Sequence, residues 1–481
     1  MKKALLTIRD EVNVKIEGLD LTDRKKLVEK FKYEIPGAKY LPTVKLGRWD
    51  GKVPYFNLGG TTYINLLPDI LPFLEEQGYD IDVDDVREYS TTLELGQVVE
   101  DSFSQRCWPN GEPIILRDYQ VEIINKFLKN PQCVQEVATG AGKTIMTAAL
   151  STSVQHLGRS IIIVPSKSLV TQTEADYKNM GLDVGVLYGD RKEYTKHHTI
   201  CTWQSLNALV KNTKNYEADV TIHDFIEDVI CIMVDEAHSA KADALKSMLT
   251  TIFAQVPTRW GLTGTIPKEE YAFQALHCCI GPTVGQLSAR ELQEQGHLSN
   301  CHVNVVQMVD YVEYKDYQQE LRYLLETEDR IDYIATLIGK IAQSGNTLVL
   351  VDRVDPGKKL ASKIPNAVFV SGATKSKARK DEYDEFAITD DKIAVATYGV
   401  AAVGINIPRI FNLVLVESGK SFTRVIQSIG RGIRRAEDKD FVQIWDITST
   451  CKFAKRHLTK RKQFYKEANY PFSIEKTEWQ S

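Results

Sequence analysis

Short, continuous apolar runs recur along most of this chain and alternate with segments of helical, amphipathic spacing. Such runs are typical of strands that are buried on both faces of a parallel sheet. They occupy residues 161–164, 229–234, 367–370, 393–396 and 413–416, and the segment 346–351 becomes apolar after its first two residues. Alternation of buried strands with helices predicts an α/β fold with parallel sheets.

The first 95 residues have a mixed pattern of their own. Residues 2–16 are strand-like, residues 21–31 predict a helix that begins near Thr22 and Asp23, and residues 68–77 predict a second helix. Residues 53–67 predict strands around a turn at Gly59-Gly60. We therefore expect a small α+β accessory domain over residues 1–95.

The rest of the chain is long enough for two further domains. Turn signals at Gly281-Pro282 and Gly285, followed by a short helical segment at 290–295, place a hinge within residues 281–296. We expect a first lobe over residues 96–286 and a second over residues 287–481, the length of ordinary domains.

The segment Val137-Ala-Thr-Gly-Ala-Gly-Lys-Thr144 predicts a phosphate-binding loop between a strand and a helix. Glycines let successive N–H groups point at phosphate oxygens. Lys143 neutralises phosphate charge and the Thr144 hydroxyl binds Mg²⁺. The loop residues are Thr139, Gly140, Ala141 and Gly142. Val137 stands where a glycine is usual, so the alternative is a glycine-rich turn that begins an ordinary helix.

A pair of acids follows the apolar run 229–234, in the segment Asp235-Glu-Ala-His238. Ligands bind at the carboxyl ends of strands in open parallel sheets. Asp235 is therefore expected to hold Mg²⁺ and Glu236 to polarise the attacking water. The alternative is a solvated turn.

These segments belong to an ordered set of motifs. The others are Arg117-Asp-Tyr-Gln120, 161–166, Thr202-Trp-Gln-Ser205, Thr263-Gly-Thr265, Thr397, Gly404-Ile-Asn-Ile-Pro408 and Gln427-Ser-Ile-Gly-Arg-Gly-Ile-Arg434. The set resembles that of the superfamily 2 helicases and translocases over residues 115–450. The resemblance implies two tandem RecA-like lobes with ATP and Mg²⁺ as cofactors.

The same motifs give further candidate site residues. Gln427, Arg431 and Arg434 have the spacing of one helix face, and arginines in trans stabilise charge on a γ-phosphate. A plain surface helix is the alternative. The resemblance implies that Arg117, Gln120, Gly404 and Asn406 bind the nucleotide. It implies nucleic-acid contacts for Pro165, Ser166, Thr202, Trp203, Gln204 and Thr397.

The accessory domain carries a basic segment around Lys45-Leu-Gly-Arg-Trp-Asp-Gly-Lys52. Lys45, Arg48 and Lys52 suit phosphates, and Trp49 is either a base-stacking residue or a core anchor. With the helix at 71–79, the segment resembles the amino-terminal domain of the bacteriophage UvsW-type helicases. That family implies branch migration, fork regression and R-loop unwinding. Since all nucleotide motifs lie later, deletion of residues 1–95 is expected to spare basal ATP hydrolysis.

Net charge and cysteine content bear on how the protein binds nucleic acid and on whether it contains disulfides or zinc. The net charge is only -4, so basic residues that bind nucleic acid must be concentrated locally, as in the run 452–466. That run is either a backbone-contacting helix or a solvated helix packed on the second lobe. Eight cysteines without a C-x-x-C pair favour a reduced, cytoplasmic protein. The group at His277, Cys278, Cys279, His297, Cys301 and His302 has no convincing zinc spacing.

The sequence thus predicts a helicase or translocase that remodels branched double-stranded DNA and R-loops in recombination, replication and repair. Single-stranded DNA is a further expected partner, as is either a single-strand-binding protein or a recombination protein. No signal peptide or membrane span is expected. The alternatives are a DEAD-box-like RNA helicase, disfavoured by Trp203-Gln204, and a non-catalytic recruitment module, disfavoured by the intact motifs.

Overall fold

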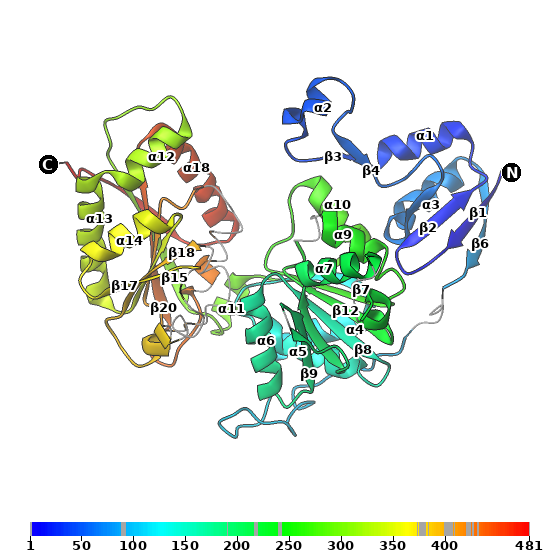
Figure 1. The fold of residues 1–481 in the computed structure, drawn as a ribbon, viewed down its shortest axis with the longest axis horizontal. Helices are drawn as coiled ribbons and strands as arrows, with labels where there is room; N and C mark the ends of the chain where they lie inside the picture. Colours follow the sequence, from blue (N-terminus) through cyan, green and yellow to red (C-terminus); the bar gives the residue numbers. More distant parts are fainter. Residues whose placement is uncertain are drawn as a thin grey trace. The chain divides into compact units, whose positions relative to one another are not determined.

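The computed structural model forms two compact units (Figure 1). One comprises Met1–Val137 and Gly142–Gln286, and the other comprises Ala138–Ala141 and Leu287–Ser481. The described residues are 2–87, 93–189, 191–215, 220–238, 243–372, 374, 381–382, 384–398, 407, 409–419, 425, 428–430 and 432–480. The three-part division at 95/96 and 286/287 stays a prediction.

The amino-terminal domain is built on a four-stranded sheet of order β5-β2-β1-β6. Its strands are β1 (Lys2–Ile8), β2 (Asn13–Glu17), β5 (Thr61–Tyr63) and β6 (Tyr79–Asp85). Helices α1 (Leu21–Lys30) and α3 (Leu67–Glu76) complete it, so the α+β class is confirmed. Residues 2–16 are not one strand, because Asp10 accepts the N–H groups of Val12 and Asn13 and turns the chain into an antiparallel hairpin.

A two-stranded ribbon extends from this domain. It pairs β3 (Lys32–Glu34) with β4 (Lys52–Pro54), and the loop between them carries the short helix α2 (Pro42–Lys45). In Figure 1 this loop lies at the end of the ribbon, away from the four-stranded sheet.

The amino-terminal domain shares its core with the first lobe. Tyr271, Ala275 and Cys278 of α10 (Glu270–Cys279) belong to the same buried cluster as the core of the domain. Asn13 also donates from its side chain to Thr250 O at 2.8 Å. Deletion of residues 1–95 would uncover the apolar α10 side chains, so it is not a clean test of the lobes alone.

The first lobe contains an eight-stranded sheet of order β10-β9-β11-β8-β12-β13-β7-β14. The strands are β7 (Gln132–Val137), β8 (Arg159–Val164), β9 (Val184–Tyr188), β10 (Arg191–Lys192), β11 (His198–Thr202), β12 (Val229–Asp235), β13 (Thr258–Thr263) and β14 (Thr283–Leu287). The central strands β9, β11, β8, β12, β13 and β7 are parallel. Their carboxyl ends therefore lie along one edge.

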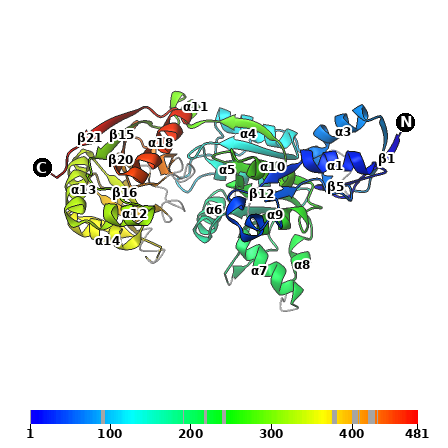
Figure 2. The same ribbon diagram turned by 90° about the horizontal axis from the view of Figure 1, so that it is seen from above.

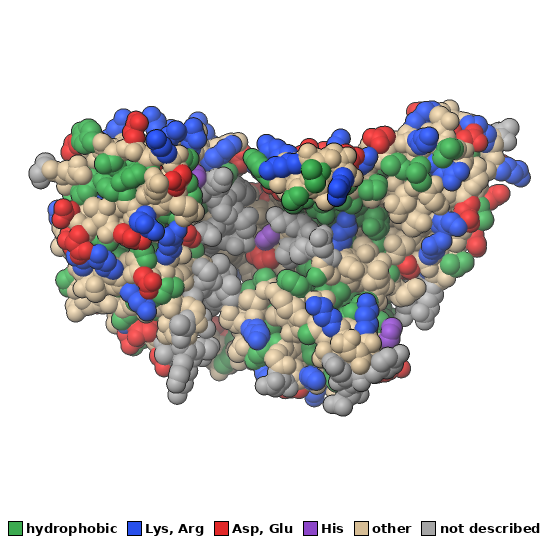
Figure 3. All heavy atoms as spheres, turned by 45° about the horizontal axis from the view of Figure 1, so that its top comes forward, with side chains coloured by type: hydrophobic (Ala, Val, Ile, Leu, Met, Phe, Trp, Pro, Cys, Tyr) green, Lys and Arg blue, Asp and Glu red, His purple; other side chains and the backbone are tan. Residues whose placement is uncertain are grey.

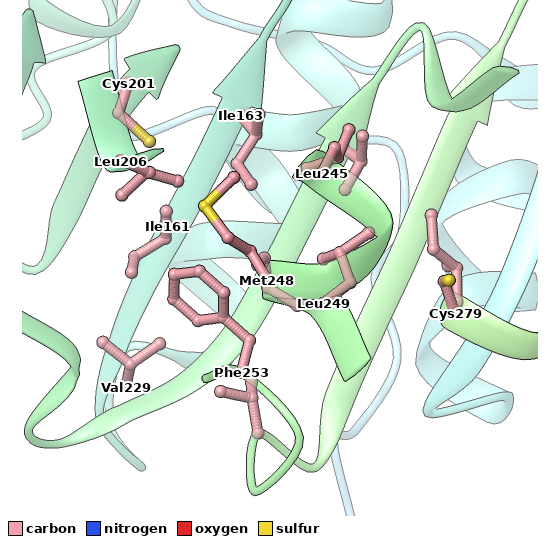
Figure 4. Packing of buried hydrophobic residues seen from close by; sticks show 14 of the residues in the cluster. Ile161, Ile163, Cys201, Leu206, Val229, Leu245, Met248, Leu249, Phe253 and Cys279 are labelled. Atoms are coloured by element: carbon pink, nitrogen blue, oxygen red, sulfur yellow. The ribbon is translucent and has the colours of Figure 1, made fainter. Parts of the chain in front are cut away.

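Helices cover both faces of this sheet. They are α4 (Asp118–Lys129), α5 (Lys143–Val154), α6 (Lys167–Asn179), α7 (Trp203–Lys214), α8 (Ile222–Ile226) and α9 (Asp243–Thr250). In Figure 2, α4 and α5 lie on one side and α7, α8 and α9 on the other. Met248 and Leu249 of α9 pack with Phe253 against Ile161 and Ile163 of β8 (Figure 4). This packing fixes the strand ends that carry the predicted motifs.

The second unit contains a seven-stranded sheet of order β17-β18-β16-β19-β20-β15-β21. Its strands are β15 (Asn300–Met308), β16 (Thr347–Val351), β17 (Ala367–Val370), β18 (Ile393–Thr397), β19 (Asn412–Val416), β20 (Phe441–Ser449) and β21 (Phe472–Thr477), and all pairings are parallel. The helices are α11 (Ala289–Glu294), α12 (Tyr317–Glu326), α13 (Glu328–Ile341), α14 (Val354–Lys363) and α18 (Lys452–Glu467). The predicted α/β class with two RecA-like parallel sheets is confirmed.

All eight cysteines are free thiols. Cys107 is exposed and the other seven are buried. Cys278 and Cys279 lie in the cores around α10. Within the described ranges, no three or more His, Cys, Asp or Glu side chains are arranged to hold a metal ion.

Candidate functional site

The predicted phosphate loop connects β7 to α5, as the sequence indicates. Gly142 is the N-cap of α5 with a φ of 83°, a left-handed conformation that favours glycine. A Cβ at Gly142 would lie 2.7 Å from Nε2 of Gln120, so a side chain would collide there. Gly140 also has a positive φ of 92°. The two glycines leave backbone space for a phosphate at the start of α5.

The acid pair lies at the carboxyl end of β12, where Asp235 ends the strand. Glu236 follows with a φ of 53°, a rare conformation for a residue with a side chain. Its Oε1 lies 3.4 Å from Nζ of Lys143, the first residue of α5. The structure therefore brings the phosphate-loop lysine and the predicted water-polarising acid together.

The electrostatics of the acid pair are asymmetric. Burial raises the pKa of Asp235 to about 6, although Lys143 opposes the shift. Burial acts on Glu236 in the same direction, but Lys143 and His238 outweigh it and lower the pKa of that carboxyl. Glu236 is thus held ionised at neutral pH, as a group that polarises water must be.

These residues fit ATP and Mg²⁺. The loop offers backbone space and Lys143, which suit phosphate, while Thr144 and Asp235 supply the oxygen ligands that Mg²⁺ prefers. Oε2 of Glu236 is buried and makes no hydrogen bond of good geometry, since its contact with His238 Nδ1 is long, at 3.4 Å. It can therefore still accept a hydrogen bond from a bound water.

Two residues that the sequence analysis left without a role extend this site. His238 Nδ1 lies 3.4 Å from Glu236 Oε2 and 3.0 Å from Thr263 Oγ1. Thr263, the last residue of β13, donates from its hydroxyl to Thr265 O at 2.9 Å. A series of polar contacts therefore connects Glu236, the predicted catalytic acid, with the Thr263-Gly-Thr265 segment. The two segments meet because they end adjacent strands, β12 and β13.

The start of α4 lies against the loop. Gln120 is almost fully buried, and its Oε1 accepts the backbone N–H of Arg117 at 3.0 Å. The same amide faces Gly142. The structure thus places Gln120 beside the phosphate loop, and the nucleotide-binding role of Arg117 and Gln120 stays a prediction.

A groove of about 530 Å³ opens along the same edge of the sheet. Its lining includes Pro165, Ser166, Thr202 and Gln204, all predicted to contact nucleic acid. Ser166 Oγ accepts the N–H of Leu169 and caps α6, and Thr202 Oγ1 accepts the N–H of Ser205 and caps α7. Two helix amino termini therefore begin at the groove, and such termini favour phosphate.

The groove also has lining residues that the sequence analysis missed. Lys167, Lys192 and Asn212 lie in it and add positive charge and a side-chain amide. Lys167 could have been recognised, because it directly follows Ser166. Trp203 is not among the lining residues and packs against the hydrophobic core instead.

Comparison with known proteins matches two families. Residues 113–268 match the family described as Type III restriction enzyme, res subunit, and residues 329–436 match the helicase conserved C-terminal domain. The ATP-dependent DNA helicase uvsW of Enterobacteria phage T4 is 23% identical over 462 residues, which cover 92% of this chain and 89% of that protein. The chain is a superfamily 2 helicase. It is accordingly an ATP-hydrolysing enzyme.

Further similarities cover smaller parts of the compared proteins. The XPB helicase/translocase subunit of Schizosaccharomyces pombe factor IIH is 22% identical over 382 residues, covering 75% of the helicase described here but only 46% of XPB. The solved structure of the restriction-modification enzyme LlaBIII bound to DNA has a TM-score of 0.57 at 14% identity, covering 86% of this helicase and 36% of LlaBIII. The latter likeness concerns the fold alone.

Two predicted residues in the second unit of the helicase can be placed. Thr397 is the last residue of β18, and Arg434 forms an isolated β-bridge with Leu298. Gly404, Asn406, Gln427 and Arg431 lie outside the described residues. Their roles stay predictions.

Lys439 is a further residue of interest that the sequence analysis missed. Its buried Nζ donates to Gly432 O at 2.5 Å and to Arg434 O at 2.8 Å. Burial lowers the pKa of this ammonium to about 7. Lys439 therefore fixes the backbone of the segment that carries the predicted arginine fingers.

The basic segment of the amino-terminal domain is exposed at Lys45, Arg48 and Lys52. Trp49 is half-buried, outside the hydrophobic core clusters, and its indole N–H donates to Lys52 O at 3.0 Å. This geometry contradicts the core-anchor alternative. Trp49 closes a local turn instead.

The carboxyl-terminal basic run forms α18. Its buried residues are Ala454, Leu458, Arg461 and Tyr465. Arg461 pairs with Asp446 at 2.8 Å in the interior and is unavailable to phosphate. Lys452, Lys455, Arg456 and Lys460 remain exposed on the outer face. The helix both packs on the lobe and presents a basic surface. None of the helices among the described residues could span a membrane.

Proposed function

We propose that this helicase uses ATP to translocate on DNA and to remodel branched structures, by branch migration, fork regression and R-loop unwinding. The observation that carries the proposal is the edge of the first sheet, where the nucleotide residues and the helix-capped groove occur together. Similarity to the T4 DNA helicase over 92% of the chain supports DNA as the substrate. The roles would lie in recombination, replication and repair.

The predicted nucleotide site and the groove lie on neighbouring strands of one sheet. Asp235 ends β12, Thr263 ends β13, and Ser166 follows β8. When bound, ATP supplies the phosphoanhydride bond and Mg²⁺ supplies positive charge beside it, held by Thr144 and Asp235. Lys143 contacts phosphate, and Glu236 orients a water and accepts its proton. His238 and Thr263 connect Glu236 with the end of β13. A change in the position or charge of Glu236 would thereby alter the contacts of Thr263 at the end of β13.

Nucleic acid would lie in the groove across the start of α6 and α7. The hydroxyls of Ser166 and Thr202 already cap these helices, so the remaining first-turn N–H groups and Lys167 are available for a phosphate backbone. Contacts of this kind do not read sequence. They suit a motor that moves along any DNA.

The first test measures ATP hydrolysis with long duplex DNA, a branched DNA and single-stranded RNA at identical salt, because phosphate contacts make affinity strongly salt-dependent. Stimulation by DNA well above that by RNA is expected. Lys143→Ala is the negative control, since it removes the phosphate contact at the loop. Greater stimulation by RNA would support the DEAD-box-like alternative, and no turnover with any nucleic acid would support a recruitment module.

The second test compares unwinding of a fork mimic, a four-way junction, an R-loop and a plain tailed duplex. We expect the three branched substrates to be processed faster than the tailed duplex. Equal rates on all four would reject branch specificity while leaving helicase activity intact.

A further inference from the structure

The loop between β3 and β4, residues 36–51, exposes large apolar side chains and is called the tip here. Tyr40 is 68% exposed, Leu46 65% and Leu41 42%. Figure 3 shows hydrophobic side chains beside Lys and Arg side chains on the surface formed by α2 and its flanking residues. Three large exposed apolar side chains within one short loop are more than the scattered single residues usual on a protein surface.

The exposure belongs to an ordered loop. Ile35 N–H donates to Gly51 O and closes the base of the tip, and short-range backbone hydrogen bonds, most of them between residues three or four apart, run through it from Ile35 to Arg48. A Cβ at Gly51 would lie 2.7 Å from the Cβ of Ala38, so the two sides of the tip are in close contact. Ala38 faces inward, whereas Leu41 and Leu46 face solvent. The backbone thus holds the apolar groups outward.

The tip is basic as well as apolar. Lys39, Lys45 and Arg48 are exposed, and Lys39 Nζ lies 5.2 Å from the centre of the Tyr40 ring. Asp50 is the one acid in residues 36–51, and it is paired with Lys32 at 2.5 Å. The surface around the apolar groups is therefore positive, in a chain whose net charge is -4.

The tip is fixed to the motor through its stalk. Tyr33 of β3 contacts Tyr55, with ring centres 5.6 Å apart, and Tyr55 contacts Tyr271 of α10 at 6.3 Å. Lys246 of α9 donates to the Tyr55 hydroxyl and lies 4.0 Å from its ring centre. An aromatic column thus joins the base of the tip to the first lobe.

We propose that the tip contacts the open end of a base-paired duplex at a branch point, with Tyr40, Leu41 and Leu46 against the exposed face of the terminal base pair. Lys45 and Arg48 hold the flanking phosphates. The inference rests on the proposed function and adds the element that meets the junction. Apolar wedges flanked by cations are an established way for proteins to unstack bases.

The charge selects nucleic acid over a protein partner. Protein interfaces of this size are depleted in lysine at their centre, whereas Lys39 and Lys45 adjoin the apolar groups. The bases at a duplex end offer a flat apolar face bordered by phosphates, which matches both features of the tip. Trp49 contributes by closing the turn that carries Arg48.

The test uses the full-length protein with Tyr40, Leu41 and Leu46 all changed to alanine. Because these side chains are exposed, the melting temperature should stay within error of wild type. The control carries Leu21→Ala and Leu58→Ala, two leucines of the same domain that are 54% and 49% exposed. Fork unwinding is measured, together with the fluorescence of 2-aminopurine placed in the first base pair of the fork.

We expect wild type and control to raise the 2-aminopurine signal on binding without ATP, because the first pair is unstacked. The triple variant should lose that rise and unwind forks about tenfold more slowly or worse. Lys45→Gln with Arg48→Gln should weaken fork binding and reduce its salt dependence. A triple variant with wild-type fluorescence and unwinding would overturn the proposal. Failure of the wild type to unwind any branched DNA would instead reject the proposed function.

Discussion

Two glutamates occupy the same place in the two sheets and have opposite surroundings. Glu236 follows β12 and Glu417 follows β19, each directly after a central parallel strand and each with a positive φ, 53° and 46° respectively. Glu236 faces Lys143 at 3.4 Å, and its other carboxylate oxygen makes only a long contact of 3.4 Å with His238 Nδ1. Glu417 is paired with the buried Arg330 at 2.7 Å, and its other oxygen accepts the Thr448 hydroxyl at 3.4 Å.

The contrast is the one expected between a reactive acid and a structural one. Charge partners lower the pKa of Glu236 and leave part of its carboxylate available. Burial raises the pKa of Glu417 against Arg330, and both of its oxygens are engaged. The same strand-end backbone therefore carries the predicted catalytic acid in one sheet and an ion pair that joins helix and strand in the other.

The largest effect is expected at the reactive acid. Glu236→Gln should still bind ATP but hydrolyse it roughly 10²- to 10⁴-fold more slowly, because the amide keeps the shape and loses the base. Single-turnover hydrolysis and nucleotide binding would be measured side by side. Glu122→Gln, an exposed acid of α4, is the control. If binding were lost together with hydrolysis, Glu236 would be structural like Glu417.

The structural acid should respond to loss of its partner. Arg330→Ala should lower the free energy of unfolding by about 3 to 5 kcal/mol, since it leaves Glu417 buried without its guanidinium. Denaturant unfolding measures the effect. Arg322→Ala, on the exposed side of α12, should change it by well under 1 kcal/mol. Equal stability in both variants would remove the distinction between the two glutamates.

Asp235 allows a sharper test, because replacing its carboxylate should abolish ATP hydrolysis and yet increase the free energy of unfolding. Its folded pKa of about 6 lies above the usual value near 3.8, so the folded state binds the proton more tightly. Stability therefore falls as pH rises from 3.8 to 6, and the full cost remains above 6.

Asp235→Asn should accordingly stabilise the nucleotide-free protein at pH 7.5 by roughly 1 to 3 kcal/mol and abolish hydrolysis. The gain should shrink as pH falls below 6. Melting curves across this pH range, with exposed Asp80→Asn as the control, measure it. A destabilised variant would mean that the carboxylate is structurally required.

The smallest effect is expected at His238. His238→Ala removes the polar contacts that connect Glu236 with Thr263. Unwinding per ATP hydrolysed should therefore fall by a few-fold, and hydrolysis itself should change less. The ratio of the two rates on one fork substrate is the readout. His156→Ala, on an exposed part of the first lobe, serves as the control. A proportional fall in both rates would place His238 in catalysis rather than coupling.

Local patterns predicted the sheets well. The apolar runs correspond to β8, β12, β16, β17, β18 and β19, and their order along the chain indicated the parallel arrangement. The hairpin within residues 2–16 was missed, although Asp10 is a typical turn residue. The docking of α10 into the amino-terminal core was not predictable, because it joins Tyr55 to Tyr271 across more than 200 residues.

The part of the site that could be predicted consists of residues whose type and motif indicate a role. Lys143 and Glu236 were named from the sequence and lie within contact distance. Arg461 was not predicted correctly. Its basic neighbours in the sequence indicated a surface cation, yet it is buried in an ion pair with Asp446. Likewise, nothing local distinguishes the exposed Tyr40 from Trp49, whose indole is held by a turn. Long-range pairing and local exposure decide such cases.

The distribution of thiols offers a direct experimental handle. Cys107 is the exposed cysteine and the other seven are buried, and burial alone raises the pKa of Cys133 and Cys201 well above the usual thiol range. Buried neutral thiols react slowly with maleimides. A dye would thus attach to the native chain at Cys107 without removal of any cysteine. Paired with one cysteine introduced on the exposed face of α18, it would report by energy transfer whether the distance between the two dyes changes when ATP is added.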